Sequence, residues 1–386
     1  MIPLNNNLLR LKRSGIRHFS NLAKTVPGCV MLTLGEPDFD TPEEIKAAAL
    51  TSLFQNRTHY AANQGVEALR QEIAAFETIR GLPCEASQVL VTAGASEALY
   101  TAITGILNPG DEVIIPTPAF LVYETIVMAA GGVPVYLDTK PDDFQITPAA
   151  LAKVVTKKTK AIILNSPNNP TGTVLSADSM EAVKQAVLGK PILVICDNVY
   201  QSLCEEKCPD LSIDPELGEQ ILLCQSYSKP YAMTGWRLGW LIGPADVIEK
   251  LLLLHAAILA SVPTFIQDAG VTALSVSPRE MAQVYARRRA FVCKRLTEMG
   301  LTFPEPKGAF YAFPDISRFG LSDEEFCTRL ITEGGVATVP GSCFGTPGHI
   351  RISYCCSDEQ LQTGLDRMEQ FLQTLKKTKP YSQFAD

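Results

Sequence analysis

Short apolar runs recur through the middle of the chain, and the residues within each run do not alternate between apolar and polar. A run of this kind is typical of a strand that is buried on both faces. The strands predicted in this way are Gln88–Thr92, Glu112–Pro116, Val133–Leu137, Lys160–Asn165, Pro191–Cys196, Gln220–Gln225 and Leu238–Gly243. The pattern therefore predicts a seven-stranded sheet with both faces covered.

Segments with helical periodicity separate most of these strands. The clearest are Ser96–Leu107, Val122–Ala130 and Ala177–Leu188. Strands that alternate with helices form a mostly parallel sheet, because each helix carries the chain back across the sheet. Leu238–Gly243 follows its neighbour without a clear helix, so this strand can run antiparallel to the others.

The two ends of the chain mix helices with a few short strands, such as Gly335–Val339 and His349–Ser353. The chain has 386 residues, which is too long for one compact core. We therefore predict a large α/β domain over residues 45–285. A smaller α+β domain would combine residues 1–44 with residues 286–386.

Two helices are predicted near the domain boundaries. Thr41 is a candidate N-cap, with Pro42 at the first helical position and Glu44 completing a capping box. Pro278–Arg295 is expected to be a helix that bridges the two domains. Its three consecutive arginines, 287–289, could suggest a phosphate site, but we interpret them as a solvated, ion-paired helix face.

Composition and charge exclude several classes of function. Hydrophobic residues make up 46% of the chain and charged residues 19%, and the formal net charge is -7. A nucleic-acid-binding protein usually carries a basic patch or stripe, so this class is disfavoured. No apolar run reaches the ~18 residues of a membrane span, and the N-terminus lacks the apolar core of a signal peptide. We expect a cytoplasmic protein.

The chain contains 11 cysteines. Several, such as Cys196 and Cys224, lie inside apolar runs, where a reduced thiol behaves as a small hydrophobic side chain. Cys204 and Cys208 form a CxxxC pair, and Cys355 and Cys356 are adjacent. Neither pair has further cysteines or histidines at zinc-ligand spacing, so we expect no metal site.

Polar residues follow the carboxyl ends of the predicted strands, where open parallel sheets bind their ligands. The turn Ala93–Ser96 leads into a helix whose free backbone N–H groups would suit a phosphate. The loop Ser166–Gly172 contains two prolines and two adjacent asparagines. Asp197 directly follows an apolar strand and is costly to bury unless it is paired, and Tyr200 lies three residues further on.

The next strand end adds an amine and a second cation. Lys229 ends the sequence SYSK and is a candidate nucleophile. Arg237 lies among glycines in GWRLG and is a candidate phosphate clamp. One sheet edge thus gathers Lys, Asp, Tyr, Asn, Ser and Arg. Pyridoxal 5′-phosphate requires these side chains, because the lysine can form the Schiff base and the aspartate can keep the ring nitrogen protonated.

An ordered set of motifs carries a family resemblance over nearly the whole chain. The motifs are GEPDFDTP, YAANQG, TAGASEAL, NPGDEV, SPNNPTG, DNVY, SYSK and MTGWRLGW. With these motifs the chain resembles the class I/II pyridoxal-phosphate-dependent aminotransferases of fold type I. Within that family it is similar to the aspartate, aromatic and N-acetyl-LL-diaminopimelate aminotransferases. The resemblance implies the two-domain α/β architecture of fold type I.

The resemblance also implies roles for individual residues. Lys229, Asp197 and Tyr200 match the Schiff-base lysine, the partner of the ring nitrogen and the donor to the ring 3′-oxygen. The other cofactor contacts that it implies are Ala95, Ser96, Phe120, Asn169, Ser226 and Arg237, with Tyr60 reaching the cofactor of the neighbouring subunit. On the substrate side it implies that Arg351 binds the α-carboxylate, and that Gly35 and Asn169 lie beside it.

The implied activity is transfer of an amino group from an L-amino acid to a 2-oxo acid, with 2-oxoglutarate as the expected acceptor and ping-pong kinetics. The resemblance further implies a homodimer with shared active sites and a place in amino-acid metabolism and biosynthesis. One alternative is a carbon–sulfur β-lyase of the same fold, which would release pyruvate and ammonia without an added oxo acid. A second is a regulator that keeps the fold without catalysis, but such a chain should have lost Lys229 or Arg351.

The amino donor stays open between aspartate, an aromatic amino acid and N-acetyl-LL-diaminopimelate. Arg17 lies in an N-terminal segment that covers the site in the family, where it could meet a distal carboxylate or could be a plain surface residue. Phe39 and Phe120 could equally line a pocket for an aromatic side chain.

Overall fold

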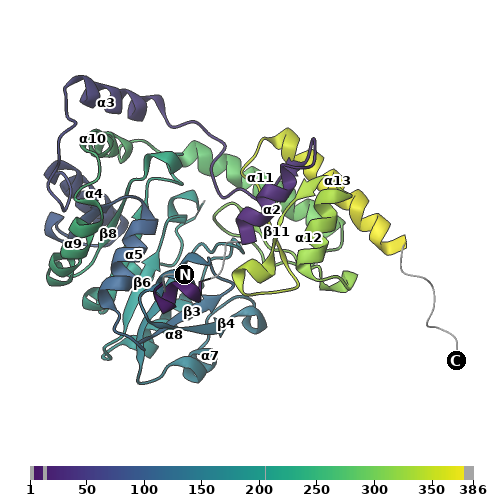
Figure 1. The fold of residues 1–386 in the computed structure, drawn as a ribbon, viewed down its shortest axis with the longest axis horizontal. Helices are drawn as coiled ribbons and strands as arrows, with labels where there is room; N and C mark the ends of the chain where they lie inside the picture. The colour runs from purple at the N-terminus through teal and green to yellow at the C-terminus, as the bar shows by residue number, and fades with distance from the viewer. Residues whose placement is uncertain (1–3, 12–14, 205, 378–386) are drawn as a thin grey trace.

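A computed structural model describes residues 4–11, 15–204 and 206–377 of the chain. Its elements gather into two groups that lie side by side in Figure 1. The larger group surrounds a seven-stranded sheet, and we call it the sheet unit. The other contains α2, α12, α13 and the short strands near the chain ends, and we call it the terminal unit. Within the described ranges, no helix combines the length and apolar character that a membrane span needs.

The seven-stranded sheet has the strand order β2-β8-β7-β6-β5-β3-β4. Its strands are β2 Val89–Thr92, β3 Glu112–Thr117, β4 Val133–Asp138, β5 Thr159–Asn165, β6 Leu193–Asp197, β7 Ile221–Ser226 and β8 Gly239–Ile242. Five of them pair in parallel, and β8 runs antiparallel between β2 and β7. The predicted strands and the predicted α/β class are therefore confirmed, including the reversed direction of the last strand.

Helices cover both faces of this sheet. The helices of the sheet unit are α3 Glu43–Phe54, α4 Glu67–Arg80, α5 Ala95–Ile106, α6 Val122–Ala129, α7 Pro148–Val154, α8 Ala177–Val187, α9 Ala245–Leu259 and α10 Thr264–Ala273. Successive strand residues point to opposite faces: Val89 and Val91 pack in the core formed with α3, α4, α8 and α10, whereas Leu90 packs in the core formed with α5, α6 and α9. Because both faces are buried over most of the sheet, the inner strands read as continuous apolar runs, whereas the edge strand β4 is mostly exposed or half-buried.

The terminal unit has its own core. It consists of the helices α2 Gly15–Ala23, α12 Asp323–Thr332 and α13 Asp358–Lys377 with the strands β1 Val30–Met31, β9 Tyr311–Ala312, β10 Val336–Ala337, β11 Val339–Pro340 and β12 Ile350–Ser353. The strands β11, β12 and β9 form an antiparallel sheet, and β1 pairs in parallel with β10. The short helix α1 (Asn6–Leu9) lies instead beside α6 of the sheet unit.

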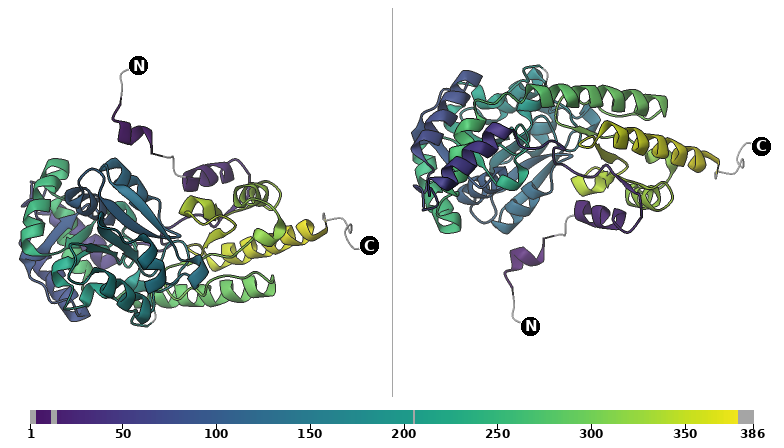
Figure 2. Two further views of the ribbon diagram at one scale, coloured as in Figure 1. Left: turned by 90° about the horizontal axis from the view of Figure 1, so that it is seen from below. Right: turned by 90° about the horizontal axis from the view of Figure 1, so that it is seen from above.

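The long helix α11 (Arg279–Glu298) extends from the sheet unit along the terminal unit, beside α13 (Figure 2). Its Arg288 is only 8% exposed, so the prediction of a solvated face is wrong for this residue. The guanidinium lies 2.8 Å from Asp38 and 2.7 Å from Asp358. Arg288 therefore ties the N-terminal segment and the start of α13 to α11.

Two further local predictions are wrong. The N-cap position of α3 is Pro42, without a side-chain cap, because the Thr41 hydroxyl donates instead to the carbonyl of Ala232 at 2.8 Å. The predicted strand over residues 335–339 is two short strands, β10 and β11, which belong to different sheets. In both cases a long-range contact prevails over the local signal.

Candidate active site

A cavity of about 580 Å³ opens at the carboxyl ends of the parallel strands, where the terminal unit faces the sheet. Segments from both units line it. The predicted site residues that border it are Gly35, Ala95, Ser96, Phe120, Asn169, Asp197, Tyr200, Ser226, Lys229, Arg237 and Arg351. The structure thus brings together residues that are more than 300 positions apart in the sequence.

Tyr60 is the exception among the predicted residues. It lies in the loop between α3 and α4, its side chain is 89% exposed, and it is not part of the cavity lining. Its predicted contact with the cofactor of a neighbouring subunit stays a prediction.

Asp197 is the last residue of β6 and is 4% exposed. Its Oδ2 atom accepts a hydrogen bond of 2.5 Å from the hydroxyl of Tyr123. Its Oδ1 atom is buried and has no hydrogen-bond partner among the residues that the structure describes. Burial raises the pKa of Asp197 to about 6, against the opposing effects of the Tyr123 hydrogen bond and the Lys229 charge. A buried carboxylate oxygen that faces a cavity in this way is prepared to accept from a ligand.

Lys229 lies just beyond the end of β7, and its amine donates to the backbone carbonyl of Gly35. The amine also lies 5.9 Å from the ring centre of Tyr200 and 5.8 Å from that of Phe310. Burial lowers the pKa of Lys229 to about 8. A larger fraction of the free amine, which is the nucleophilic form, is therefore present near neutral pH than for an exposed lysine.

Tyr200 and Tyr311 face each other across the junction of the two units. Their hydroxyl oxygens are 3.0 Å apart. Burial raises the pKa of Tyr200 well above its ordinary value, and the neighbouring Tyr311 adds to the effect. The Tyr200 hydroxyl therefore keeps its proton at neutral pH and can donate a hydrogen bond into the cavity.

Arg351 is a buried cation in β12, with 2% of its surface exposed. Its guanidinium donates to Oδ1 of Asn169 at 2.8 Å and to the carbonyl of Thr33 at 2.7 Å. It also lies over the ring of Tyr311, at 4.5 Å from the ring centre. Its Nε atom has no hydrogen-bond partner within the described part of the chain. A fixed guanidinium with a free donor suits a carboxylate ligand.

Asn165, at the end of β5, holds the strand ends in place. Its side-chain amide donates to the backbone carbonyl of Asp197 at 2.9 Å, and its carbonyl oxygen accepts from the N–H of Asn169 at 2.9 Å. Since Asn169 also accepts from Arg351, one chain of hydrogen bonds connects the carboxylate region of the cavity with its arginine.

The start of α5 forms a candidate anion site. Its N-cap is Gly94, which has no side-chain cap, so the first N–H groups of the helix are available to a ligand. A Cβ atom on Gly94 would lie 2.8 Å from a guanidinium nitrogen of Arg237, and one on Gly239 would lie 3.0 Å from the nitrogen of Ala95. Side chains at these two glycines would fill the space, so their absence lets Arg237 approach the helix start.

A different set of side chains borders the opposite end of the cavity. Helix α2 contributes Arg17, Ser20 and Asn21, and Lys24 follows it directly. Phe120 also lines the cavity, whereas Phe39 does not. Phe39 packs against the ring of Tyr285 at 5.6 Å, so the suggestion that it lines a substrate pocket is not supported.

Sequence reasoning missed several residues that the structure places in the cavity wall. Tyr123, Thr33, Asn165 and Tyr311 all border it. Asn165 could have been found, because it ends a predicted strand at the edge that binds ligands. The other three lie inside a helix or in the terminal unit, and their position depends on packing between segments far apart in the sequence.

Comparison with known proteins places the chain among relatives of one kind. The model of the family "Aminotransferase class I and II" matches residues 27–368. Aromatic-amino-acid aminotransferase 2 of Thermococcus litoralis is 38% identical over 97% of this chain and 100% of the relative. The probable N-acetyl-LL-diaminopimelate aminotransferase of Bacillus subtilis is 37% identical over 96% of this chain and 95% of the relative.

A solved structure gives the same result for the fold. Aspartate aminotransferase from Thermus thermophilus with maleate superposes with a TM-score of 0.91 at 35% identity, covering 96% of this chain and 100% of that chain.

Proposed function

The chain belongs to the class I and II aminotransferases, enzymes that use pyridoxal 5′-phosphate to transfer an amino group between an amino acid and a 2-oxo acid, and on this premise we propose how its own residues do so. One observation carries the proposal: the amine of Lys229, the unpartnered Oδ1 of Asp197 and the guanidinium of Arg351 face the same cavity. The relatives do not favour the alternative, a carbon–sulfur β-lyase.

The cavity fits the cofactor at both of its polar ends. Asp197 would accept from the protonated ring nitrogen, which gives its unpartnered oxygen a partner. The helix start at Ala95 and Ser96, with Ser226 and Arg237, would hold the phosphate. Phe120 would lie against the ring. When bound, pyridoxal 5′-phosphate supplies an aldehyde that condenses with amines and a ring that takes up electron density.

Lys229 would accept the proton of the substrate α-carbon and return it. Its pKa of about 8 lets the amine accept a proton from the α-carbon of the substrate and give it back on the same side of the site. Asp197, ionised at neutral pH, would keep the ring nitrogen protonated throughout. Tyr200 would donate its hydrogen bond to the ring 3′-oxygen, together with the amide of Asn169.

Arg351 would bind and orient the substrate. Arg351 lines the cavity and has an Nε donor without a partner in the described part of the chain, and a guanidinium can form two parallel bonds to an α-carboxylate. The backbone of Gly35 lies on the same side, and a Cβ atom there would lie 2.5 Å from the Tyr311 hydroxyl. The substrate would therefore be fixed by its carboxylate, with its α-carbon directed toward Lys229.

We assign the α2 end of the cavity to the substrate side chain. Arg17 and Lys24 provide two cations there, which suits the distal carboxylate of aspartate, glutamate or 2-oxoglutarate. Phe120 provides an apolar contact for an aromatic donor. The proposed enzyme accepts 2-oxoglutarate and uses an aspartate, aromatic or N-acetyl-LL-diaminopimelate donor. The relatives named for aromatic, acyl-diaminopimelate and aspartate substrates support this range.

A panel of half-reactions tests the proposal. Each candidate donor is added to the cofactor-loaded enzyme, and the change in cofactor absorbance is followed; each oxo acid is then added to restore it. Rapid conversion by one or more of the named donors and recovery with 2-oxoglutarate are expected. Pyruvate and ammonia released without an oxo acid would identify a lyase, and no recovery with 2-oxoglutarate would dismiss that acceptor.

We also propose a cytoplasmic homodimer that acts in amino-acid biosynthesis. Several large apolar side chains on α3, α9 and the loop after α3 are exposed, among them Phe54 at 85%, Leu253 at 70% and Tyr60 at 89%. Exposed apolar side chains of this size commonly mark protein interfaces. Tyr60 would then reach the phosphate site of the partner subunit.

Mixing two inactive variants tests the shared site. A hybrid dimer of Tyr60→Ala and Lys229→Ala subunits has one site that carries both changes and one that carries neither. Partial recovery of activity on mixing is expected. A fully active monomer in solution would contradict both the dimer and the role of Tyr60.

A further inference from the structure

A pair of cysteines lies next to the segment that carries Tyr200, outside the residues that border the active-site cavity. Cys204 directly follows the 3₁₀ turn η3 (Gln201–Leu203), and its sulfur atom lies 2.7 Å from that of Cys208. Both thiols are partly exposed and border a separate surface cavity of about 580 Å³. A small molecule in solution can therefore reach them.

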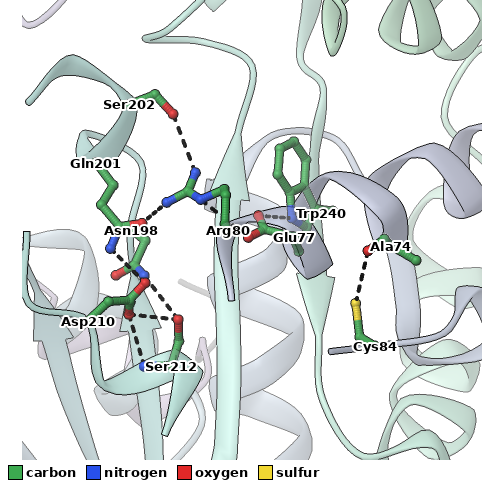
Figure 3. Close-up of polar contacts among 10 residues, drawn as sticks. All are labelled: Ala74, Glu77, Arg80, Cys84, Asn198, Gln201, Ser202, Asp210, Ser212 and Trp240. Atoms are coloured by element: carbon green, nitrogen blue, oxygen red, sulfur yellow. Dashed lines mark hydrogen bonds and ion pairs between the residues drawn. The ribbon is translucent and has the colours of Figure 1, made fainter. Parts of the chain in front are cut away.

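The surrounding hydrogen bonds hold the two cysteines in this arrangement. Asp210, two residues after Cys208, accepts from the side chains of Gln201 at 2.7 Å and Asn198 at 3.1 Å, as Figure 3 shows. The N–H of Cys204 donates to the carbonyl of Gln201 at 3.2 Å. Hydrogen bonds thus attach Cys204 and Asp210 to η3 and the residues just before it, where the two sulfur atoms lie close together.

The two thiols are chemically different. Contact with Cys204 lowers the pKa of Cys208; burial and the charge of Asp210 oppose this effect, and the guanidinium groups of Arg80 and Arg289 support it. Contact with Cys208 raises the pKa of Cys204 far above its ordinary value. Cys204 is also enclosed on one side, since a Cβ atom on Gly308 would lie 2.8 Å from its sulfur. Cys208 is therefore the more acidic thiol of the pair, and Cys204 is the neighbour held in reach of it.

We propose that Cys204 and Cys208 are a redox modification site, which a peroxide converts into a reversible disulfide bond. This inference is independent of the transamination proposed above. A sulfur–sulfur bond is ~2.05 Å long, so the sulfur atoms need to approach by less than ~1 Å. Disulfides of intracellular proteins are usually transient and regulatory, which suits a pair beside the turn that follows Tyr200.

The reaction is balanced with hydrogen peroxide as the oxidant. The Cys208 thiolate attacks one peroxide oxygen, the O–O bond breaks, and the hydroxide that leaves takes up a proton to become water. The Cys204 sulfur then loses its proton and attacks the oxidised Cys208 sulfur, the S–O bond breaks, and a second water leaves. Two thiols and one peroxide thus give one disulfide and two waters.

The other cysteines provide controls. Cys84 and Cys293 are also partly exposed, but burial raises the pKa of each to about 11, and neither is hydrogen-bonded to another cysteine sulfur among the described residues. Cys355 and Cys356 are adjacent but buried. A general reaction of exposed thiols would therefore modify Cys84 and Cys293 as well, whereas the proposed site would not.

Peptide mapping of the oxidised enzyme tests the proposal. The cofactor-loaded wild-type protein is treated with one equivalent of hydrogen peroxide, alkylated and digested with trypsin without reductant. Trypsin cleaves after Lys207, between the two cysteines, so a disulfide would join two peptides that otherwise separate. The expected result is this joined pair, with the mass of two hydrogen atoms lost, and its disappearance after treatment with dithiothreitol.

Two single variants sharpen the assignment. In Cys208→Ser, Cys204 is expected to stay a free, alkylatable thiol after peroxide treatment, whereas Cys84→Ser should form the disulfide as the wild type does. The wild-type map decides the question even if a variant fails to fold. Two outcomes would overturn the proposal. In the first, Cys204 and Cys208 can still be alkylated when other cysteines have been oxidised. In the second, Cys208 becomes a sulfinic acid while Cys204 stays a free thiol.

Discussion

The two ends of the active-site cavity hold their charged groups in different ways. At the buried end, where the cofactor and the substrate α-carboxylate would lie, Asp197 and Arg351 are 4% and 2% exposed and each has fixed hydrogen-bond partners. At the α2 end, Arg17 and Lys24 are exposed to solvent. Buried, fixed charges act on the reacting atoms in a low-dielectric environment, whereas exposed cations on a surface helix can adapt to different side chains. We therefore expect chemistry at the first end and substrate choice at the second.

The largest effect should come from Lys229, because we propose that it moves the substrate proton and the family resemblance implies that it forms the Schiff base. Lys229→Ala is expected to reduce kcat by at least ~10⁴-fold, the upper range for a lost proton-transfer group. Borohydride reduction of the loaded enzyme followed by peptide mapping should label Lys229. The surface variant Lys190→Ala should keep wild-type activity, and a label on any other lysine would refute the assignment.

Asp197→Asn should have the second-largest effect. The amide is expected to keep the cofactor bound but to lower kcat by ~10²–10⁴-fold, because it cannot hold the ring nitrogen protonated. Steady-state kinetics with saturating donor and acceptor measure this loss. A variant whose kcat stays within about threefold of the wild type, well below that range, would exclude the proposed role.

Arg351→Lys tests the buried cation on the substrate side. An ammonium cannot form two parallel bonds to a carboxylate. The transition-state stabilisation that kcat/KM reports should therefore fall by about 1.5–3 kcal/mol. Because the α-carboxylate is common to all substrates, glutamate and phenylalanine should lose equally. A loss restricted to one of them would place Arg351 at the side-chain end instead.

The buried carboxylate should also reduce the stability of the apoenzyme. Burial raises the pKa of Asp197 to about 6, from ~3.9 in an unfolded chain. Between these two pKa values the folded state binds more protons than the unfolded state. The free energy of unfolding therefore falls as the pH rises from about 4 to about 6. Asp197→Asn should raise the unfolding free energy of the apoenzyme at pH 7 by roughly 1–3 kcal/mol, as measured by denaturant titration. Equal pH dependence in both proteins would show that the carboxyl is not shifted.

The smallest and most selective effect is expected for Arg17→Ala. If Arg17 binds a distal carboxylate, the transition-state stabilisation that kcat/KM reports for glutamate should fall by about 1.5 kcal/mol, the lower range for a hydrogen bond to a charged group. The value of kcat/KM for phenylalanine should change little. Lys24→Ala is the matched comparison on the same side of the cavity. Equal effects of Arg17→Ala on both substrates would remove Arg17 as a specificity residue.

The sheet and most of the cofactor-binding residues could be predicted from the sequence alone. The strands are short apolar runs buried on both faces, and the residues that follow them must meet at one edge of a parallel sheet. For that reason Asp197, Lys229, Asn169 and Arg237 could be identified as one site from their order along the chain. The family motifs added Arg351, which no local pattern would have placed.

The contacts between the two units could not be predicted from the sequence, because they depend on how distant segments pack. Tyr200 meets Tyr311, and Arg351 meets Asn169, across 111 and 182 residues of sequence. Packing of α11 against Asp38 and the start of α13 also buries Arg288 in a helix face that the sequence predicts to be solvated. Periodicity reports the local environment of a side chain, whereas these pairings depend on how two separately formed cores fit together.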